Sequence, residues 1–203
     1  TVHRYNMQYT VLSRKWRPKK FDQVVGQKHV TTILINSIKS NRVSHAYLFS
    51  GPRGTGKTTI ARILAQNLNS VENISESLDI IELDGASNRG IDEIRDLRDS
   101  VKYAPSEGKY KIFIIDEAHM LTKEAFNALL KTLEEPPSHV VFVLATTESH
   151  KIPPTISSRC QKYDFKKISI EKILNHLQAI LNAEKYTSED KALSLISIKA
   201  DGS

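Results

Sequence analysis

The sequence contains only one cysteine, Cys160, among its 203 residues. An internal disulfide is therefore impossible, and cysteine usage favours a reducing compartment over a secreted setting. No apolar run approaches the roughly 20 residues that a membrane-spanning helix needs, and no secretory signal precedes the first charged stretch. These absences predict a cytoplasmic protein that makes no contact with a membrane.

What the chain does contain is typical of a globular protein, with 39% hydrophobic and 26% charged residues. Its length allows one large domain, or one domain and part of another. The net charge of +6 and the sequence pI of about 9.3 make nucleic acid a permissible partner. A solvated, lysine-rich surface explains the charge equally well, because basic residues are dense only in residues 14–20. Charge alone leaves both explanations open.

One motif stands out, G-x-x-x-x-G-K-T over residues 51–58, the pattern of a phosphate-binding P-loop. An apolar run at 46–50 predicts a strand before it, and residues 58–69 predict a helix after it. Glycines let successive backbone N–H groups point at an anion, and the positive end of the helix adds to that field. The predicted nucleotide-binding residues here are Gly51, Pro52, Arg53, Gly54, Thr55, Gly56, Lys57, Thr58 and Thr59. A glycine turn with a chance lysine is the alternative, and it leaves the flanking strand and helix unexplained.

An acidic pair, Asp116-Glu117, follows the apolar run 112–115. Ligands of open α/β sheets bind at the carboxyl ends of strands. We therefore predict that Asp116, opposite Thr58, holds Mg²⁺, partly through water, and that Glu117 orients or deprotonates the attacking water. Lys57 would reach the terminal phosphates. The alternative role for the two carboxylates is to cap the next helix.

Two more residues are candidates for phosphoryl-transfer chemistry. Thr147 follows the apolar run 140–144, where its hydroxyl could contact the γ-phosphate or the attacking water. The alternative is that this strand-end hydroxyl only forms hydrogen bonds within the protein. Arg159 is a candidate arginine finger, supplied in trans to a neighbouring subunit. An arginine in a loop is otherwise a surface residue.

Short apolar runs alternate with helical patterns along the chain. Strands are predicted at 46–50, 79–83, 112–115, 140–144 and 161–165, and helices at 28–40, 58–69, 91–103, 122–135, 170–184 and 188–200. The alternation predicts an α/β fold with a mostly parallel five-stranded sheet and helices on both faces. Helix 28–40 is expected to bury Val30, Ile33, Leu34 and Ile38.

The last two predicted helices have no strand between them, so we place a domain boundary near residue 166. Residues 7–165 are expected to form the nucleotide-binding domain, and residues 166–203 part of an all-helical domain that is cut short. We interpret residues 1–6 as an added leader, because Met7 could be the natural start.

At this point seven segments agree in order and spacing with one family. They are residues 12–18 (LSRKWRP), 24–27 (VVGQ), 45–54 (HAYLFSGPRG), 115–121 (IDEAHML), 127–137 (NALLKTLEEPP), 144–147 (LATT) and 158–160 (SRC). From about Gln8 to its end the chain resembles the gamma/tau subunits of the bacterial DNA polymerase III clamp loader, ATPases of the AAA+ class.

The resemblance implies an AAA+ P-loop fold with a helical lid, and ATP and Mg²⁺ as cofactors. It implies a pentamer with other gamma/tau subunits, delta and delta-prime, which uses ATP to place the sliding clamp on primer-template DNA. Thr147 matches the position called sensor 1, and Arg159 would complete a neighbour's site. Arg17, Pro18, Val24 and Val25 match the segment that packs around the nucleotide base.

Two departures from the family pattern matter. Family members usually carry a four-cysteine zinc module after the P-loop helix, whereas residues 70–78 hold no cysteine. Either this member lacks the module or a segment is missing from this sequence, and we predict no zinc. The lid ends just before the place of the family's sensor 2 arginine. We therefore expect this chain alone to be a monomer that binds ATP and hydrolyses it weakly.

Three other functions are compatible with parts of this pattern. A non-hydrolysing structural subunit of the same assembly is one, although intact Lys57, Thr58, Asp116 and Glu117 argue against it. Another AAA+ DNA-processing ATPase, such as a Holliday-junction motor or a eukaryotic-type clamp loader, is the second. A small-molecule kinase shares only the P-loop.

Overall fold

The computed structural model describes residues 10–88 and 90–203. The expected leader at residues 1–6 and the start at Met7 lie outside the described residues. At the centre of the fold is a five-stranded sheet in the order β2-β3-β4-β1-β5, with every adjacent pair parallel. The strands are β1 (Ala46–Ser50), β2 (Ile80–Asp84), β3 (Lys111–Asp116), β4 (Val140–Thr146) and β5 (Gln161–Asp164). The predicted five-stranded parallel sheet is confirmed.

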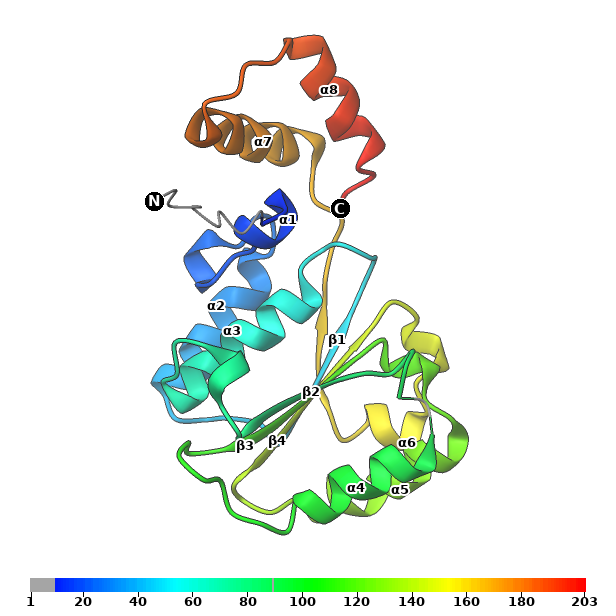
Figure 1. Cartoon of the computed structure of the whole chain (residues 1–203). Helices are drawn as coiled ribbons and strands as arrows, with labels where there is room; N and C mark the ends of the chain where they lie inside the picture. The colour runs from blue at the N-terminus through cyan, green and yellow to red at the C-terminus, as the bar shows by residue number, and fades with distance from the viewer. Residues whose placement is uncertain (1–9, 89) are drawn as a thin grey trace, which may run out of the picture.

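Helices cover both faces of this sheet. Figure 1 shows α2 (Lys28–Lys39) and α3 (Lys57–Asn69) on one face, and α4 (Ile91–Ser100), α5 (Lys123–Glu134) and α6 (Pro154–Ser157) on the other. Parallel strands need such crossover helices, which cover the sheet from both sides. The predicted three-layer α/β architecture is therefore confirmed.

Residues of each central strand divide between the two faces with a period of two, as a pleated strand requires. In β1, Tyr47 and Phe49 pack into the cluster under α2 and α3, and Leu48 packs into the cluster under α4 and α5. Phe113 of β3 and Phe142 of β4 stack with ring centroids 5.3 Å apart in that second cluster. The strands are thus apolar throughout because both of their faces are buried.

Local capping explains where α5 begins. Thr122 stands before its first turn, and its hydroxyl oxygen accepts a hydrogen bond from the backbone N–H of Ala125 at 3.2 Å. This side-chain bond satisfies one of the N–H groups that a helix leaves free at its start. The pair Pro136-Pro137 follows directly after the helix ends. The start that the sequence predicted for this helix is therefore confirmed.

One local expectation differs from the structure. Ile33 of α2 was expected inside, but it is 50% exposed. At 100° per residue Ile33 lies about 110° from the middle of the buried stripe, which is made by Val30, Leu34 and, in place of Ile33, Thr31. The described segment before α2 contains a short helix, α1 (Leu12–Lys15), and the turn η1 (Phe21–Gln23).

A helical pair, α7 (Ile170–Glu184) and α8 (Asp190–Lys199), follows the sheet and lies beside α1 (Figure 1). The carboxylate of Glu184 accepts from Trp16 Nε1 at 2.7 Å and pairs with Lys15 Nζ at 2.7 Å. The pair is therefore tied to the segment that precedes the sheet. In the described residues, no helix combines the length and the apolar character that crossing a membrane requires.

Candidate nucleotide-binding site

The ends of three central strands place the candidate residues at one edge of the sheet. In the register of the sheet Ser50 pairs with Thr146, and Ile115 pairs with Leu144. The P-loop follows β1, the acidic pair ends β3 and Thr147 follows β4. Segments far apart in the sequence therefore meet at the carboxyl edge, where open parallel sheets bind ligands.

The loop itself has the curled backbone that its glycines predict. Gly51, Gly54 and Gly56 have φ angles of 143°, 75° and 99°. A Cβ on Gly51 would lie 2.4 Å from the carbonyl oxygen of Phe165, so the close approach of the linker after β5 also requires glycine there. Gly56 is the N-cap of α3, whose first turn has no side-chain cap. The start of the helix therefore presents backbone N–H groups that can donate hydrogen bonds to an anion.

Lys57 lies inside this curl, with 6% of its surface exposed. Its Nζ donates to the carbonyl oxygens of Gly51 and Pro52, each at 2.8 Å. Burial lowers the pKa of Lys57, and the carboxylates of Glu117 and Asp116 partly oppose that shift. The ammonium is thus held by carbonyls of the loop itself, close to the acidic pair.

Asp116 and Thr58 meet across the edge, as the sequence predicted. The Thr58 hydroxyl donates to Asp116 Oδ2 at 2.6 Å, and Asp116 Oδ1 accepts from the backbone N–H of Glu117 at 2.9 Å. A hydroxyl and a carboxylate side by side are the oxygen ligands that Mg²⁺ prefers. These oxygen atoms, beside a loop whose backbone N–H groups can donate to an anion, fit Mg²⁺ bound together with a phosphate group.

Glu117 adopts a left-handed backbone conformation with φ of 45°. The Thr147 hydroxyl donates to Glu117 Oε2 at 3.2 Å. His119 also reaches this carboxylate, with Nδ1 3.4 Å from Glu117 Oε2. The structure therefore brings the predicted residues Glu117 and Thr147 together, and it adds His119, to which the sequence alone gave no role.

A cleft of about 1250 Å³ opens beside the loop. Its lining includes the predicted base-contacting residues Arg17, Pro18, Val24 and Val25. Arg17 Nε donates to the hydroxyl of Thr59 at 3.1 Å, which fixes this segment against α3.

The far wall of the cleft comes from α7, which the sequence analysis did not place in the site. Ile173, His176 and Leu177 line it, together with Ile168 of the linker. The signal was present as an apolar stripe at helical spacing in residues 170–184, but such a stripe indicates burial without saying against what.

Gln27 is a second residue that the sequence analysis did not assign. It is fully buried, and its Nε2 donates to the carbonyl oxygens of Lys166 at 2.7 Å and Thr55 at 3.3 Å. This side chain connects the loop with the linker to the helical pair.

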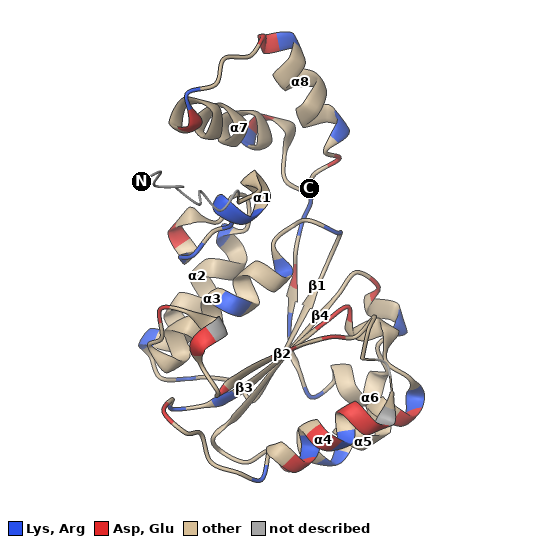
Figure 2. Ribbon diagram, in the orientation of Figure 1, with Lys and Arg blue, Asp and Glu red and all other residues tan. Residues whose placement is uncertain are grey.

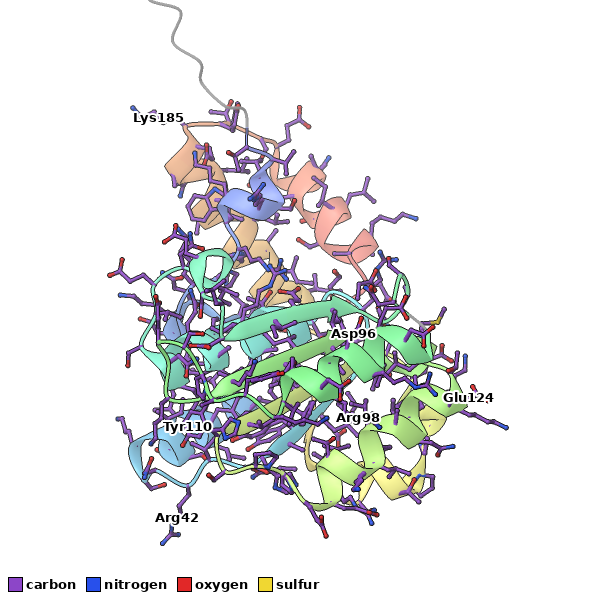
Figure 3. The ribbon with its side chains drawn as sticks, turned by 60° about the horizontal axis from the view of Figure 1, so that its bottom comes forward. Arg42, Asp96, Arg98, Tyr110, Glu124 and Lys185 are labelled. Carbon is purple, nitrogen blue, oxygen red and sulfur yellow. The ribbon has the colours of Figure 1, made fainter. Side chains whose placement is uncertain are left out.

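Arg159 is the one predicted residue that the fold keeps away from the loop. It precedes β5, whereas the P-loop follows β1, and the two strands are parallel. With a rise of about 3.3 Å per residue the four residues of β5 alone separate the two edges by roughly 13 Å. Arg159 Nη2 instead pairs with Glu134 Oε1 at 2.6 Å, on the surface. Arg159 therefore belongs to the edge where the strands begin. Figure 3 labels two other residues of that edge, Arg42 and Tyr110, which precede β1 and β3.

No group of three or more His, Cys, Asp or Glu side chains suited to a metal occurs in the part of the chain that the structure describes. The charges of the outer helices are mixed in sign: Figure 2 shows acidic and basic segments interspersed along α4 and α5. These helices present no surface of a single sign, so the net charge of the chain still does not decide for nucleic acid.

Comparison with known families gives one match that covers most of the chain. Residues 26–169 match the model described as "DNA polymerase III, delta subunit". The chain is also 52% identical to the DNA polymerase III subunit tau of Bacillus subtilis strain 168, and 48% identical to subunit tau of Escherichia coli K12. Each alignment takes in 97% of this chain, but only 38% and 33% of the relative. The chain thus spans about a third of the length of these relatives.

Solved structures with the same fold include two from Thermotoga maritima. The RuvB Holliday junction branch migration motor has a TM-score of 0.70 at 22% identity, over 90% of this chain and 59% of RuvB. A DNA polymerase III gamma subunit-related protein has a TM-score of 0.60 at 25% identity, over 82% of this chain and 57% of that protein. The first likeness shows the fold alone, and the second agrees with the sequence matches.

Proposed function

The chain belongs to the DNA polymerase III subunit family whose model covers residues 26–169, and from that premise we propose that it is an ATP-binding motor subunit of the replicative clamp loader. In this role ATP binding and hydrolysis load the sliding clamp onto primed DNA for DNA polymerase III. The similarity to tau over 97% of the chain supports a gamma/tau subunit rather than another AAA+ DNA-processing ATPase. We place it in the cytoplasm, where a replication protein acts.

The contact between Thr58 and Asp116 is the observation that carries this proposal. Two motifs 58 residues apart meet at 2.6 Å on the edge where the loop curls. A structural subunit that only used the fold as a wedge would need neither the buried Lys57 nor an oxygen pair beside it. The complete set of polar groups therefore favours a subunit that binds and hydrolyses ATP.

The residues of the chain divide the chemistry among them. When bound, Mg²⁺ neutralises charge on the β- and γ-phosphates; Thr58 and Asp116 would hold it, partly through water. Lys57 would exchange its two loop carbonyls for phosphate oxygens. Glu117 would orient the attacking water and accept its proton, while Thr147 fixes the carboxylate of Glu117. Positioning and charge, rather than covalent chemistry, supply the catalysis.

The base of the nucleotide would occupy the cleft beside the loop. Arg17, Pro18, Val24 and Val25 form one wall of it, and apolar side chains of α7 form the other. The helical pair, within residues 166–203, would thus act as the lid of the nucleotide-binding domain at residues 7–165. Nucleotide binding between the walls would bring lid and domain together.

Arg159 would act in trans, in the site of a neighbouring subunit. Its place at the opposite edge of the sheet separates it from the chain's own loop, so a second subunit must bring it to ATP. The partners in that ring are other gamma/tau subunits, delta and delta-prime, with the sliding clamp and primer-template DNA as the load. The chain alone, a monomer whose site receives no arginine from a neighbouring subunit, should hydrolyse ATP weakly. We propose no zinc for this member.

Calorimetric titration of the 203-residue chain with Mg-ATP tests the proposal. We expect binding in the micromolar to low millimolar range, with a loss of affinity of about a hundredfold or more for Lys57→Ala. Lys39→Ala, on the exposed last turn of α2, is the matched control and should bind like the unchanged chain. If the Lys57→Ala variant bound Mg-ATP as tightly as the unchanged chain and its thermal unfolding were unchanged, the proposed motor function would be refuted. Only a scaffolding role would then remain.

A reconstituted complex separates the clamp loader from other AAA+ machines. The chain extended to the length of its relatives would be combined with delta, delta-prime and the clamp. We expect the clamp and primed DNA to stimulate ATP hydrolysis, and Arg159→Ala to lower the rate about a hundredfold or more, because an arginine finger is worth about 10³–10⁵ in rate. Stimulation by junction DNA without a clamp would favour the other machines.

A further inference from the structure

His119 is a nearly buried histidine that the proposed mechanism does not use. It belongs to the turn η3 (Ala118–Met120), directly after the acidic pair. Only 7% of its side chain is exposed. Both ring nitrogens face oxygen atoms, and these belong to three different side chains.

Nδ1 lies between two of these oxygens. It is 3.1 Å from the hydroxyl of Thr146 and 3.4 Å from Oε2 of Glu117. The Thr146 hydroxyl accepts from the backbone N–H of Glu148 at 3.0 Å, so its own proton can be donated to the ring. On the other side of the ring, Nε2 is 3.2 Å from Oε1 of Glu148.

A neutral imidazole carries a hydrogen on one nitrogen only. With the hydrogen on Nδ1, the ring presents an N–H to the carboxylate of Glu117, 3.4 Å away. With the hydrogen on Nε2, it presents an N–H to the carboxylate of Glu148, 3.2 Å away, while Nδ1 accepts from the Thr146 hydroxyl. The two forms place the N–H beside different carboxylates with the same ring position, and only the first places it beside Glu117.

Glu148 in turn belongs to a segment that leads to Arg159. It is the N-cap of η4 (Ser149–Lys151), which runs through α6 to that arginine. Lys151 Nζ pairs with Glu148 Oε2 at 2.8 Å and lowers the pKa of Glu148. His150 is the other charged or titratable neighbour of this carboxylate, at 3.8 Å. His119 thus lies between Glu117 and the segment that carries the trans-acting arginine.

We propose that His119 is a positioning residue, whose Nδ1 holds Glu117 in place for water activation and whose Nε2 links it through Glu148 to the segment ending at Arg159. This inference rests on the proposed function, because it assigns Glu117 its role. A contact that a neighbouring subunit makes with Arg159 would then change which carboxylate the N–H of the ring faces, and so release or fix Glu117.

Three variants separate positioning from mere packing. His119→Asn keeps a donor close to the place of Nδ1, whereas His119→Gln keeps one close to the place of Nε2, and His119→Ala keeps neither. Hydrolysis of Mg-ATP would be measured in single turnovers with the 203-residue chain in excess, and ATP affinity by calorimetry. His150→Ala, an exposed histidine on the same segment, is the control.

We expect about a tenfold lower hydrolysis rate for His119→Ala and His119→Gln, with ATP affinity within about twofold of the unchanged chain. His119→Asn should retain most of the rate, and His150→Ala all of it. Equal rates in His119→Ala and the unchanged chain would overturn the inference, and so would equal rescue by Asn and Gln. A purely structural histidine would instead lower affinity and rate together.

The ring nitrogens report the contact without any hydrolysis. Nitrogen NMR shifts of His119 in the nucleotide-free chain should move on Glu117→Gln, because the acceptor at Nδ1 loses its charge, and should stay on His150→Ala. Unchanged shifts in Glu117→Gln would refute the contact itself. If the unchanged chain bound no ATP while these shifts moved, the proposed function would fail and the contact would stand.

Discussion

Asp79 and Asp116 both stand at strand ends, but the two edges of the sheet treat them differently. Asp79, before β2, is 2% exposed and accepts three backbone N–H groups, from Ser106, Glu107 and Gly108, at 2.6–2.8 Å. Asp116, the last residue of β3, accepts from one hydroxyl and from the N–H of its neighbour. The first carboxylate is held by the backbone of the loop that precedes β3. The second keeps acceptor capacity for a cation, which is the property that distinguishes a binding carboxylate from a structural one.

The largest effect that this comparison predicts is on stability. Asp79→Asn places an NH₂ group among three backbone donors, and unpaired buried donors cost about 1–3 kcal/mol. We expect unfolding in urea to show a loss of about 2–3 kcal/mol, with ATP affinity unchanged. Asp96→Asn, on the exposed face of α4 (Figure 3), is the control and should stay within about 0.5 kcal/mol. A stability loss below about 1 kcal/mol for Asp79→Asn would erase the distinction between the two edges.

Asp116→Asn should give the converse result. The amide keeps the shape and the bond with Thr58 but loses the charge that faces a cation. We expect the gain in ATP affinity from added Mg²⁺ to fall about tenfold, or about 1.4 kcal/mol, with stability within about 0.5 kcal/mol. Calorimetric titrations with Mg²⁺ and with a chelator measure this gain. The same gain in the variant and the unchanged chain would show that Asp116 does not face the metal.

Acid should remove the contribution of Asp79 to the free energy of unfolding in a defined pH range. Burial alone would raise the pKa of Asp79, but the three N–H donors and Lys111 more than offset it and lower the pKa below its ordinary value of 3.8. A carboxyl with a lowered folded-state pKa stabilises the fold above its ordinary pKa, and this contribution disappears as the pH falls through the folded-state value. The stability difference between the unchanged chain and Asp79→Asn should therefore be constant from about pH 7 to 5 and shrink below about pH 4. A difference that grew in acid would contradict this sign.

The smallest effect is expected for Arg159 within the chain alone. Its pair with Glu134 is on the surface, with side-chain exposures of 32% and 49%, and such pairs contribute about 0–1 kcal/mol. Arg159→Ala should therefore leave ATP affinity unchanged and stability within about 0.5 kcal/mol, by calorimetry and urea unfolding. Any marked loss of ATP affinity in the isolated chain would indicate that Arg159 acts in its own subunit and not in trans.

The residues that the sequence placed correctly at the edge are those that belong to a motif. Lys57, Thr58, Asp116 and Glu117 follow from spacing and from the strands before them. The prediction for Ile33 was wrong because the buried stripe of α2 extends toward Thr31 and not toward Ile33, and an apolar pattern alone does not show on which side the stripe ends. Asp79 and His119 resemble any polar residue beside a strand, and most of their partners are 27–29 residues away.

The amino-acid sequence by itself determined the alternation of strands and helices, the curled loop and the acidic pair, because period, capping and glycine preference act between near neighbours. Only the tertiary structure decided that Gln27 contacts the linker and that α7 lines the cleft. It also decided that Arg159 lies at the opposite edge of the sheet, where it pairs with Glu134. The physical reason is that strand order and register fix those contacts, and both depend on how buried faces pack across the whole chain.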